Sequence, residues 1–84
     1  MNFIDNFNLT NPRFLENLLK KNPSLTQKEI MLCMYIKLNY SSKDISKLMN
    51  VSRTTIDTYR YNLRKKLRLN KNQSLVSHLN TVQN

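Results

Sequence analysis

The fold is decided by residues 42–67, which read SKDISKLMNVSRTTIDTYRYNLRKKL. Ser42 is predicted to cap a short helix, because a serine side chain can accept a hydrogen bond from a backbone amide of the first turn. That helix has one apolar face, formed by Ile45, Leu48 and Met49. Asn50-Val51-Ser52 then interrupts the pattern, and Ser52 is predicted to cap a second, longer helix.

The second helix combines an apolar face with a strong positive charge. Its core-facing residues are predicted to be Ile56, Leu63 and Leu67. The basic residues around that face are Arg53, Arg60, Arg64, Lys65, Lys66 and Arg68. Two short helices joined by a tight turn, the second carrying most of the charge, are typical of a helix-turn-helix that places its second helix in the DNA major groove.

The charge of the whole chain points the same way. The 84 residues make one small domain with a formal net charge of +9. The excess is uneven, because residues 51–84 hold seven Lys or Arg against one acid, whereas residues 1–50 hold seven against four. Such a balance indicates a polyanion as partner, although a basic surface that is merely solvated would give the same count. The helix-turn-helix pattern favours nucleic acid.

Composition excludes most catalytic and metal sites. The chain has no glycine, so it contains no Gly-rich phosphate loop and no nucleophile elbow. With Cys33 as the only cysteine and His78 as the only histidine, we expect no internal disulfide, no metal and no cofactor. We expect Cys33 in the core and His78 in solvent, and we expect the protein not to be an enzyme.

No stretch approaches the ~20 apolar residues of a membrane span, and the first residues do not form a signal peptide. We therefore expect a cytoplasmic protein with no membrane contact from this segment.

Local signals predict three further helices. Asn11-Pro12 is interpreted as the start of a helix that reaches Lys20-Lys21 and stops at Asn22-Pro23, while residues 1–10 are expected to be partly ordered. Thr26 and Glu29 have the spacing of a capping box, followed by a helix to about Leu38. That helix is expected to bury Leu32, Cys33 and Ile36.

Asn39 then stands where a helix-ending residue with positive φ is expected. A loop from Leu69 leads to a last helix, over about 73–81. Its apolar stripe consists of Leu75, Val76, Leu79 and Val82.

Four short motifs occur in series over residues 25–69. They are Leu25-Thr26-x-x-Glu29, Ser42-Lys43-Asp44-Ile45-Ser46, Ser52-x-x-Thr55-Ile56 and Lys66-Leu67-x-Leu69. Together they resemble the LuxR-type (GerE-like) helix-turn-helix DNA-binding domain. The resemblance implies an all-α, four-helix domain over residues 25–83, preceded by a lead-in of residues 1–24 with a short helix. It also implies that the helix after Ser52 enters the major groove and that the fourth helix mediates dimerisation.

The chain departs from the common family pattern at four positions. Asn39 replaces a usual glycine, Ser46 a usual alanine, Tyr59 a usual histidine and Asp57 a usual lysine. The last two lie on the DNA-facing helix, so the family's base preference does not transfer to this sequence.

Helical geometry separates the side chains that could read bases from those that could hold phosphates. Opposite the core face lie Thr54, Asp57, Thr58, Tyr61, Lys65 and Arg68. We expect Asp57, Thr58 and Tyr61 to read bases, Asp57 by accepting from cytosine and Thr58 by touching a thymine methyl. Asp57 could instead serve only to stabilise the positive end of the helix dipole, and Tyr61 could contact only a phosphate.

The candidate phosphate contacts are Thr26, Lys43, Arg53, Thr54, Thr55, Tyr59, Arg60, Arg64, Lys65 and Lys66. Arg60 could instead pair with Asp44 or Glu29.

The sequence thus predicts a sequence-specific double-stranded DNA-binding domain, the output domain of a bacterial transcriptional regulator. We expect a homodimer whose candidate contacts are Val76, Leu79 and Val82, and a possible sensor domain upstream in a longer parent chain. Two alternatives stay open: a sigma-factor-like promoter-recognition domain, and a basic helical module that docks an acidic protein. If about six phosphates are neutralised, affinity should fall roughly as the fifth power of salt concentration.

Overall fold

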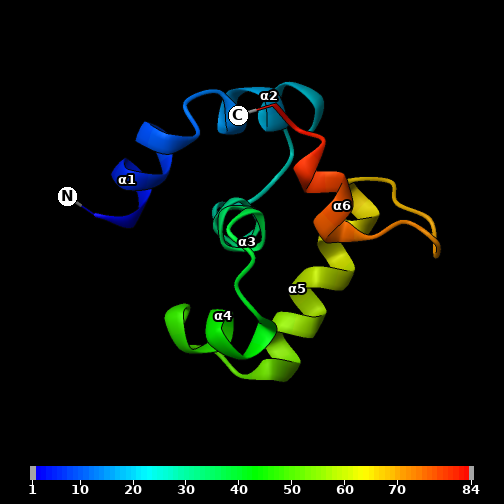
Figure 1. Ribbon diagram of the computed structural model, residues 1–84. Helices are drawn as coiled ribbons and strands as arrows, with labels where there is room; N and C mark the ends of the chain where they lie inside the picture. The colour runs from blue at the N-terminus through cyan, green and yellow to red at the C-terminus, as the bar shows by residue number, and fades with distance from the viewer. Residues whose placement is uncertain (1, 84) are drawn as a thin grey trace.

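The computed structural model describes residues 2–83, which form six α-helices and no strand (Figure 1). The helices are α1 (Phe3–Thr10), α2 (Phe14–Lys21), α3 (Gln27–Lys37), α4 (Ser42–Leu48), α5 (Arg53–Lys66) and α6 (Leu75–Asn80). The predicted all-α fold is confirmed. In Figure 1, α3 runs through the middle, with α1 and α2 on one side and α4 and α5 on the other. No helix in the described part is long and apolar enough to cross a membrane.

One hydrophobic core draws side chains from all six helices. Its most deeply buried members include Phe7, Phe14, Leu18, Leu32, Cys33, Ile36, Ile45, Ile56, Leu63 and Leu79. The central helix α3 is buried through five consecutive residues, from Leu32 to Ile36. A helix with apolar residues all round is stable only when it is covered on several sides. The other five helices supply that cover (Figure 1).

The capping predictions for α3 and α5 are confirmed. At the start of α3, the Thr26 amide donates to Glu29 Oε1 over 2.8 Å, and the Glu29 amide donates to Thr26 Oγ1 over 3.2 Å. At the start of α5, the Thr55 amide donates to Ser52 Oγ over 3.1 Å. Both helices therefore begin at the residues that their side-chain chemistry indicates.

The cap of α4 is one residue earlier than predicted. Ser41, not Ser42, has the extended backbone of a cap, and its Oγ accepts the Asp44 amide over 3.1 Å. Either of the two adjacent serines has a hydroxyl that could cap the helix. Because α3 ends in a tight turn, Ser41 is the one that lies directly before α4. The apolar face of α4 is also narrower than predicted, because Leu48 is 55% exposed.

This cap is directly testable. Ser41→Ala is expected to lower the free energy of unfolding by about 1 kcal/mol, because a first-turn amide loses its acceptor. Ser42→Ala serves as the control and should change it little, since Ser42 lies inside α4, where alanine is the better helix former. Urea unfolding of both variants measures the difference. A larger loss for Ser42→Ala would contradict the assignment.

The N-terminal segment differs most from its prediction. Residues 3–10 form a complete helix, α1, and Asn11 closes it instead of capping α2. The Asn11 backbone and side-chain amides both donate to the Phe7 carbonyl, over 2.8 and 3.3 Å. The Phe3 ring stacks on Tyr35 of α3, with the ring centroids 4.6 Å apart. Helix α2 then starts at Phe14 without a side-chain cap and ends, as predicted, before Asn22-Pro23.

Three helices end in a left-handed residue although the chain has no glycine. The residues with positive φ are Asn39 (66°), Asn50 (56°) and Arg68 (58°). After α5, the Leu69 amide bonds the Arg64 carbonyl and the Arg68 amide bonds the Lys65 carbonyl, the paired bonds of a Schellman motif. The same pair of bonds closes α3 and α4. The prediction for Asn39 is confirmed. Arg68 lies beyond the end of α5, so it does not continue the polar face of that helix.

The last helix, α6, is shorter than predicted. It spans Leu75–Asn80, and the Ser77 amide donates to the Ser74 side chain in front of it. Leu79 is fully buried in the core of this chain, so it has no surface left for a second copy and is removed from the dimerisation candidates. Val76 is 36% exposed and Val82 is partly buried.

Candidate nucleic-acid interface

Helix α5 presents two different faces, as its spacing predicts. Ile56 and Leu63 are completely buried and Leu67 is buried just beyond the helix end. On the opposite face, the side chains of Thr54, Asp57, Thr58 and Tyr61 are all exposed. Helix α4 packs against α5, and the turn between them starts at Asn50. The pair forms a helix-turn-helix whose second helix is open to solvent along its polar face.

Two contacts order this exposed face. The Lys65 ammonium lies 4.7 Å from the centroid of the Tyr61 ring, a cation–π contact, although Tyr61 is 59% exposed. The Thr58 hydroxyl donates to the Thr54 carbonyl over 3.2 Å. The hydroxyl proton of Thr58 is therefore used within the helix, and its methyl group remains for apolar contact.

Two cations that the sequence suggested for phosphates are bound within the chain instead. Arg64 donates to the carbonyls of Gln73 and Asn70, over 2.8 and 2.7 Å, and so fixes the loop before α6. Lys66 lies 2.7 Å from Glu29 Oε1 and also donates to the Ser24 carbonyl. We therefore remove Arg64 and Lys66 from the phosphate candidates.

Glu29 joins the first turn of α3 to the last turn of α5. Burial alone would raise the pKa of its carboxyl group, but hydrogen bonds from Lys66 and from Thr26 outweigh burial and lower the pKa. Glu29 is paired with Lys66 and not with Arg60, so the alternative that Arg60 pairs with Glu29 is wrong. Among residues 2–83 the other ion pair is Lys20–Glu16, so Arg60 does not pair with Asp44 either.

Cys33 lies on the buried side of α3. Burial, together with the nearby charge of Glu29, raises the pKa of its thiol to about 12, so the group stays protonated. The expectation that Cys33 is a core residue is confirmed.

A family model described as "GerE: Bacterial regulatory proteins, luxR family" matches residues 23–79. The chain belongs to the LuxR family. It therefore carries a helix-turn-helix DNA-binding domain of bacterial transcription regulators, with α3 to α6 as its four helices. Comparison with curated proteins and with solved structures found no match. Helices α1 and α2 lie outside the matched range, yet Phe7, Phe14 and Leu18 are part of the core of the LuxR-type domain.

The other predicted phosphate contacts of this LuxR-type domain differ in accessibility. Thr26, Lys43, Arg53, Thr54 and Lys65 are exposed, whereas Thr55, Tyr59 and Arg60 are half-buried. The Thr55 hydroxyl also lies 2.9 Å from Ser52 Oγ at the cap of α5. The exposed set therefore has the most freedom to reach a phosphate.

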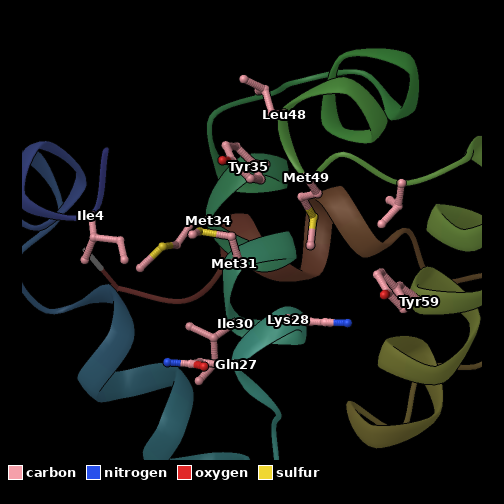
Figure 2. A pocket seen from close by; sticks show the side chains of 11 residues that line it. Ile4, Gln27, Lys28, Ile30, Met31, Met34, Tyr35, Leu48, Met49 and Tyr59 are labelled. Carbon is pink, nitrogen blue, oxygen red and sulfur yellow. The ribbon is translucent and has the colours of Figure 1, made fainter. Parts of the chain in front are cut away.

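Tyr59 stands where two hollows of the LuxR-type domain meet. One is an apolar groove of about 370 Å³, whose wall includes Met31, Met34 and Met49 (Figure 2). In Figure 2, Lys28 extends from α3 towards the side on which α5 carries Tyr59. The Lys28 ammonium is 5.9 Å from the centroid of the Tyr59 ring. Sequence reasoning did not single out Lys28, because only the packing of α3 on α5 brings it beside the exposed helix face.

Proposed function

We propose that this chain binds double-stranded DNA sequence-specifically, with α5 in the major groove, as the output domain of a bacterial transcriptional regulator. The observation that carries the proposal is the exposed face of α5, formed by Thr54, Asp57, Thr58 and Tyr61, within a domain of the LuxR family. Residues in the N-terminal half of such a helix are the ones that reach base edges. Binding to chromosomal DNA would place the protein in the bacterial cytoplasm.

The residues of this exposed face have proposed roles. Asp57 accepts a hydrogen bond from a cytosine amino group, and the Thr58 methyl packs on a thymine methyl. Tyr61 contacts a base next to them, held in place by Lys65. The phosphate contacts that position the helix come from Lys43, Arg53, Arg60 and Lys65, with Thr26, Thr54, Thr55 and Tyr59 as further candidates.

The proposal includes a homodimer. Val76 and Val82 are the apolar residues of the α6 region that keep accessible surface, and they are proposed to face the second copy. Two copies related by twofold symmetry would read a palindrome, with half-sites about one helical turn apart or a multiple of it. A sensor domain in a longer parent chain would then control the output.

Selection of bound duplexes from a random pool tests the proposal. The native chain is expected to select a palindrome, and its affinity should fall steeply as salt rises. Asp57→Ala should relax the preference at one position of each half-site, at a discrimination cost of about 1–3 kcal/mol. Asp5→Ala, on α1, is the matched control and should select the native sequence.

Each outcome has a distinct meaning. If the native chain retards no duplex at low salt but forms a tight complex with an acidic protein, the DNA proposal is wrong and the interaction module replaces it. If the native chain selects a sequence that Asp57→Ala selects equally well, DNA binding stands and the base-reading role of Asp57 fails.

A further inference from the structure

A second hollow, here called the α3–α5 hollow, lies beside the exposed face of α5. It has a volume of about 410 Å³ and opens between the first turn of α3 and the second half of α5. Its walls are Thr26, Lys28 and Glu29 at the start of α3, and Tyr59, Asn62, Lys65 and Lys66 from α5. Nothing in the sequence pattern assigned a role to Lys28 or Asn62.

The α3–α5 hollow is positively charged and its carboxylate is already neutralised. Three lysines line it against one acid, a net charge of +2. Lys66 lies 2.7 Å from Glu29 Oε1, so these two charges cancel within the fold. The remaining cations, Lys28 and Lys65, are exposed at the mouth of the hollow. Their charges face solvent without a carboxylate partner among residues 2–83.

With α5 in the major groove as proposed, the hollow would lie beside one of the two DNA strands. At about 100° per residue, Asn62 lies on one flank of the exposed face and Arg53 and Arg60 lie on the other. A helix in the major groove runs between the two backbones of the duplex. The arginine flank can therefore serve one strand, and the α3–α5 hollow lies where the other strand would pass.

We propose that the α3–α5 hollow binds one phosphate of the DNA backbone, with Lys28 and Asn62 as contacts beside Lys65. The inference rests on the proposed function. It adds Lys28 beside Thr26, the phosphate candidate at the start of α3, and Asn62 beside those on α5. The two lysines provide charge, and the Asn62 amide provides a neutral donor of fixed direction. Lys65 also contacts the Tyr61 ring, so the phosphate site and the base-reading face share one side chain.

Single-phosphate neutralisation tests the site. In the selected duplex, each phosphate is replaced in turn by an uncharged methylphosphonate, and binding of the full chain is measured. For the native protein, replacing one particular phosphate in each half-site should weaken binding more than replacing its neighbours does. For Lys28→Met, replacing that phosphate should have no larger effect than replacing its neighbours. Asn62→Ala should no longer be weakened by a methylphosphonate at that same phosphate. Arg60→Met should instead no longer be weakened by one at a phosphate of the opposite strand. Lys28→Met should also reduce the slope of log affinity against log salt by about 0.9 for each half-site occupied.

Lys20→Met is the matched control, because it removes one exposed lysine from α2, on the other side of α3 from α4 and the start of α5 (Figure 1). It should keep the native slope and the native methylphosphonate profile, and unchanged urea midpoints would show that both variants fold.

If the native chain binds its duplex but Lys28→Met keeps the native slope and profile, the hollow is not a phosphate site and the proposed function still stands. If Lys28 and Asn62 couple to phosphates on different strands, the shared site is also refuted. If the native chain binds no duplex, the proposed function itself fails.

Discussion

Phe7→Ala is expected to lower the free energy of unfolding by about 3–5 kcal/mol, the range for truncating a buried phenylalanine. Phe7 is 2% exposed although it belongs to α1, outside the range that the family model matches. Its ring packs edge-on against Phe14, with the centroids 5.4 Å apart. For so small a domain this loss is comparable to the whole stability, so the variant should be largely unfolded at 37 °C.

Leu9→Ala is the matched control for Phe7→Ala, because it truncates an apolar residue on the same helix that is 68% exposed. Its effect should stay within about 0.5 kcal/mol. Urea unfolding followed by circular dichroism measures both variants. Equal stability of the two would mean that α1 does not belong to the core of the domain.

Glu29→Gln is expected to lower the free energy of unfolding by about 2 kcal/mol at pH 7, as for a lost charge-assisted hydrogen bond. The side chain of Glu29 is 8% exposed, and its carboxylate binds both Lys66 and the Thr26 amide. The amide of glutamine still accepts at Thr26 but carries no charge for Lys66. The loss stays below that of a fully buried pair, since the Lys66 side chain is 33% exposed and can be rehydrated.

The same pair gives the domain a pH dependence of known sign. The pKa of Glu29 is lower in the folded chain than its ordinary value of 4.5. The contribution of the Glu29 carboxylate to the free energy of unfolding is therefore complete above pH 4.5 and is lost as the pH falls through the lower folded pKa. The stability difference between the native chain and Glu29→Gln should shrink from pH 5 towards pH 3, as urea unfolding at several pH values would show.

Glu16→Gln controls for the charge change, since Glu16 forms an exposed pair with Lys20 at 3.9 Å. Its effect should be at most about 0.5 kcal/mol at any pH. A difference between the native chain and Glu29→Gln that stays constant down to pH 3 would contradict the role of the Glu29 carboxylate.

Local chemistry made much of the fold predictable. The Thr26–Glu29 capping box, the Ser52 cap and the positive φ of Asn39 depend on residues a few positions apart, and each was predicted correctly. Choices between equivalent neighbours were not predictable, as Ser41 and Ser42 show. Helix α1 was not predicted as a complete helix because its polar residues, such as Asn6 and Asn8, are poor helix formers. The cap of Asn2 on the Asp5 amide was the signal that could have revealed it.

The candidate site was predictable in type but not in detail. Helical spacing separated the buried and exposed faces of α5 correctly, because that separation depends only on the period of the helix. The partners of Arg64 and Lys66 lie on other elements, as do the neighbours of Lys28. Sequence spacing within one helix carries no information on such contacts. It therefore suggested Arg64 and Lys66 for phosphates and did not suggest Lys28, which is now proposed as a phosphate contact.

The internal use of Arg64 and Lys66 affects how the protein would search a genome. Helix α5 carries five basic residues, and these two are bound to the chain's own carbonyls and carboxylate. Each phosphate contact that is not made weakens attachment to arbitrary DNA, where charge supplies nearly all of the affinity. A chromosome offers millions of such competing sites, so under the proposed function weaker attachment to them would leave more protein free to occupy specific sites. The same two bonds that fix α5 in the fold would thus shorten each unproductive encounter with DNA.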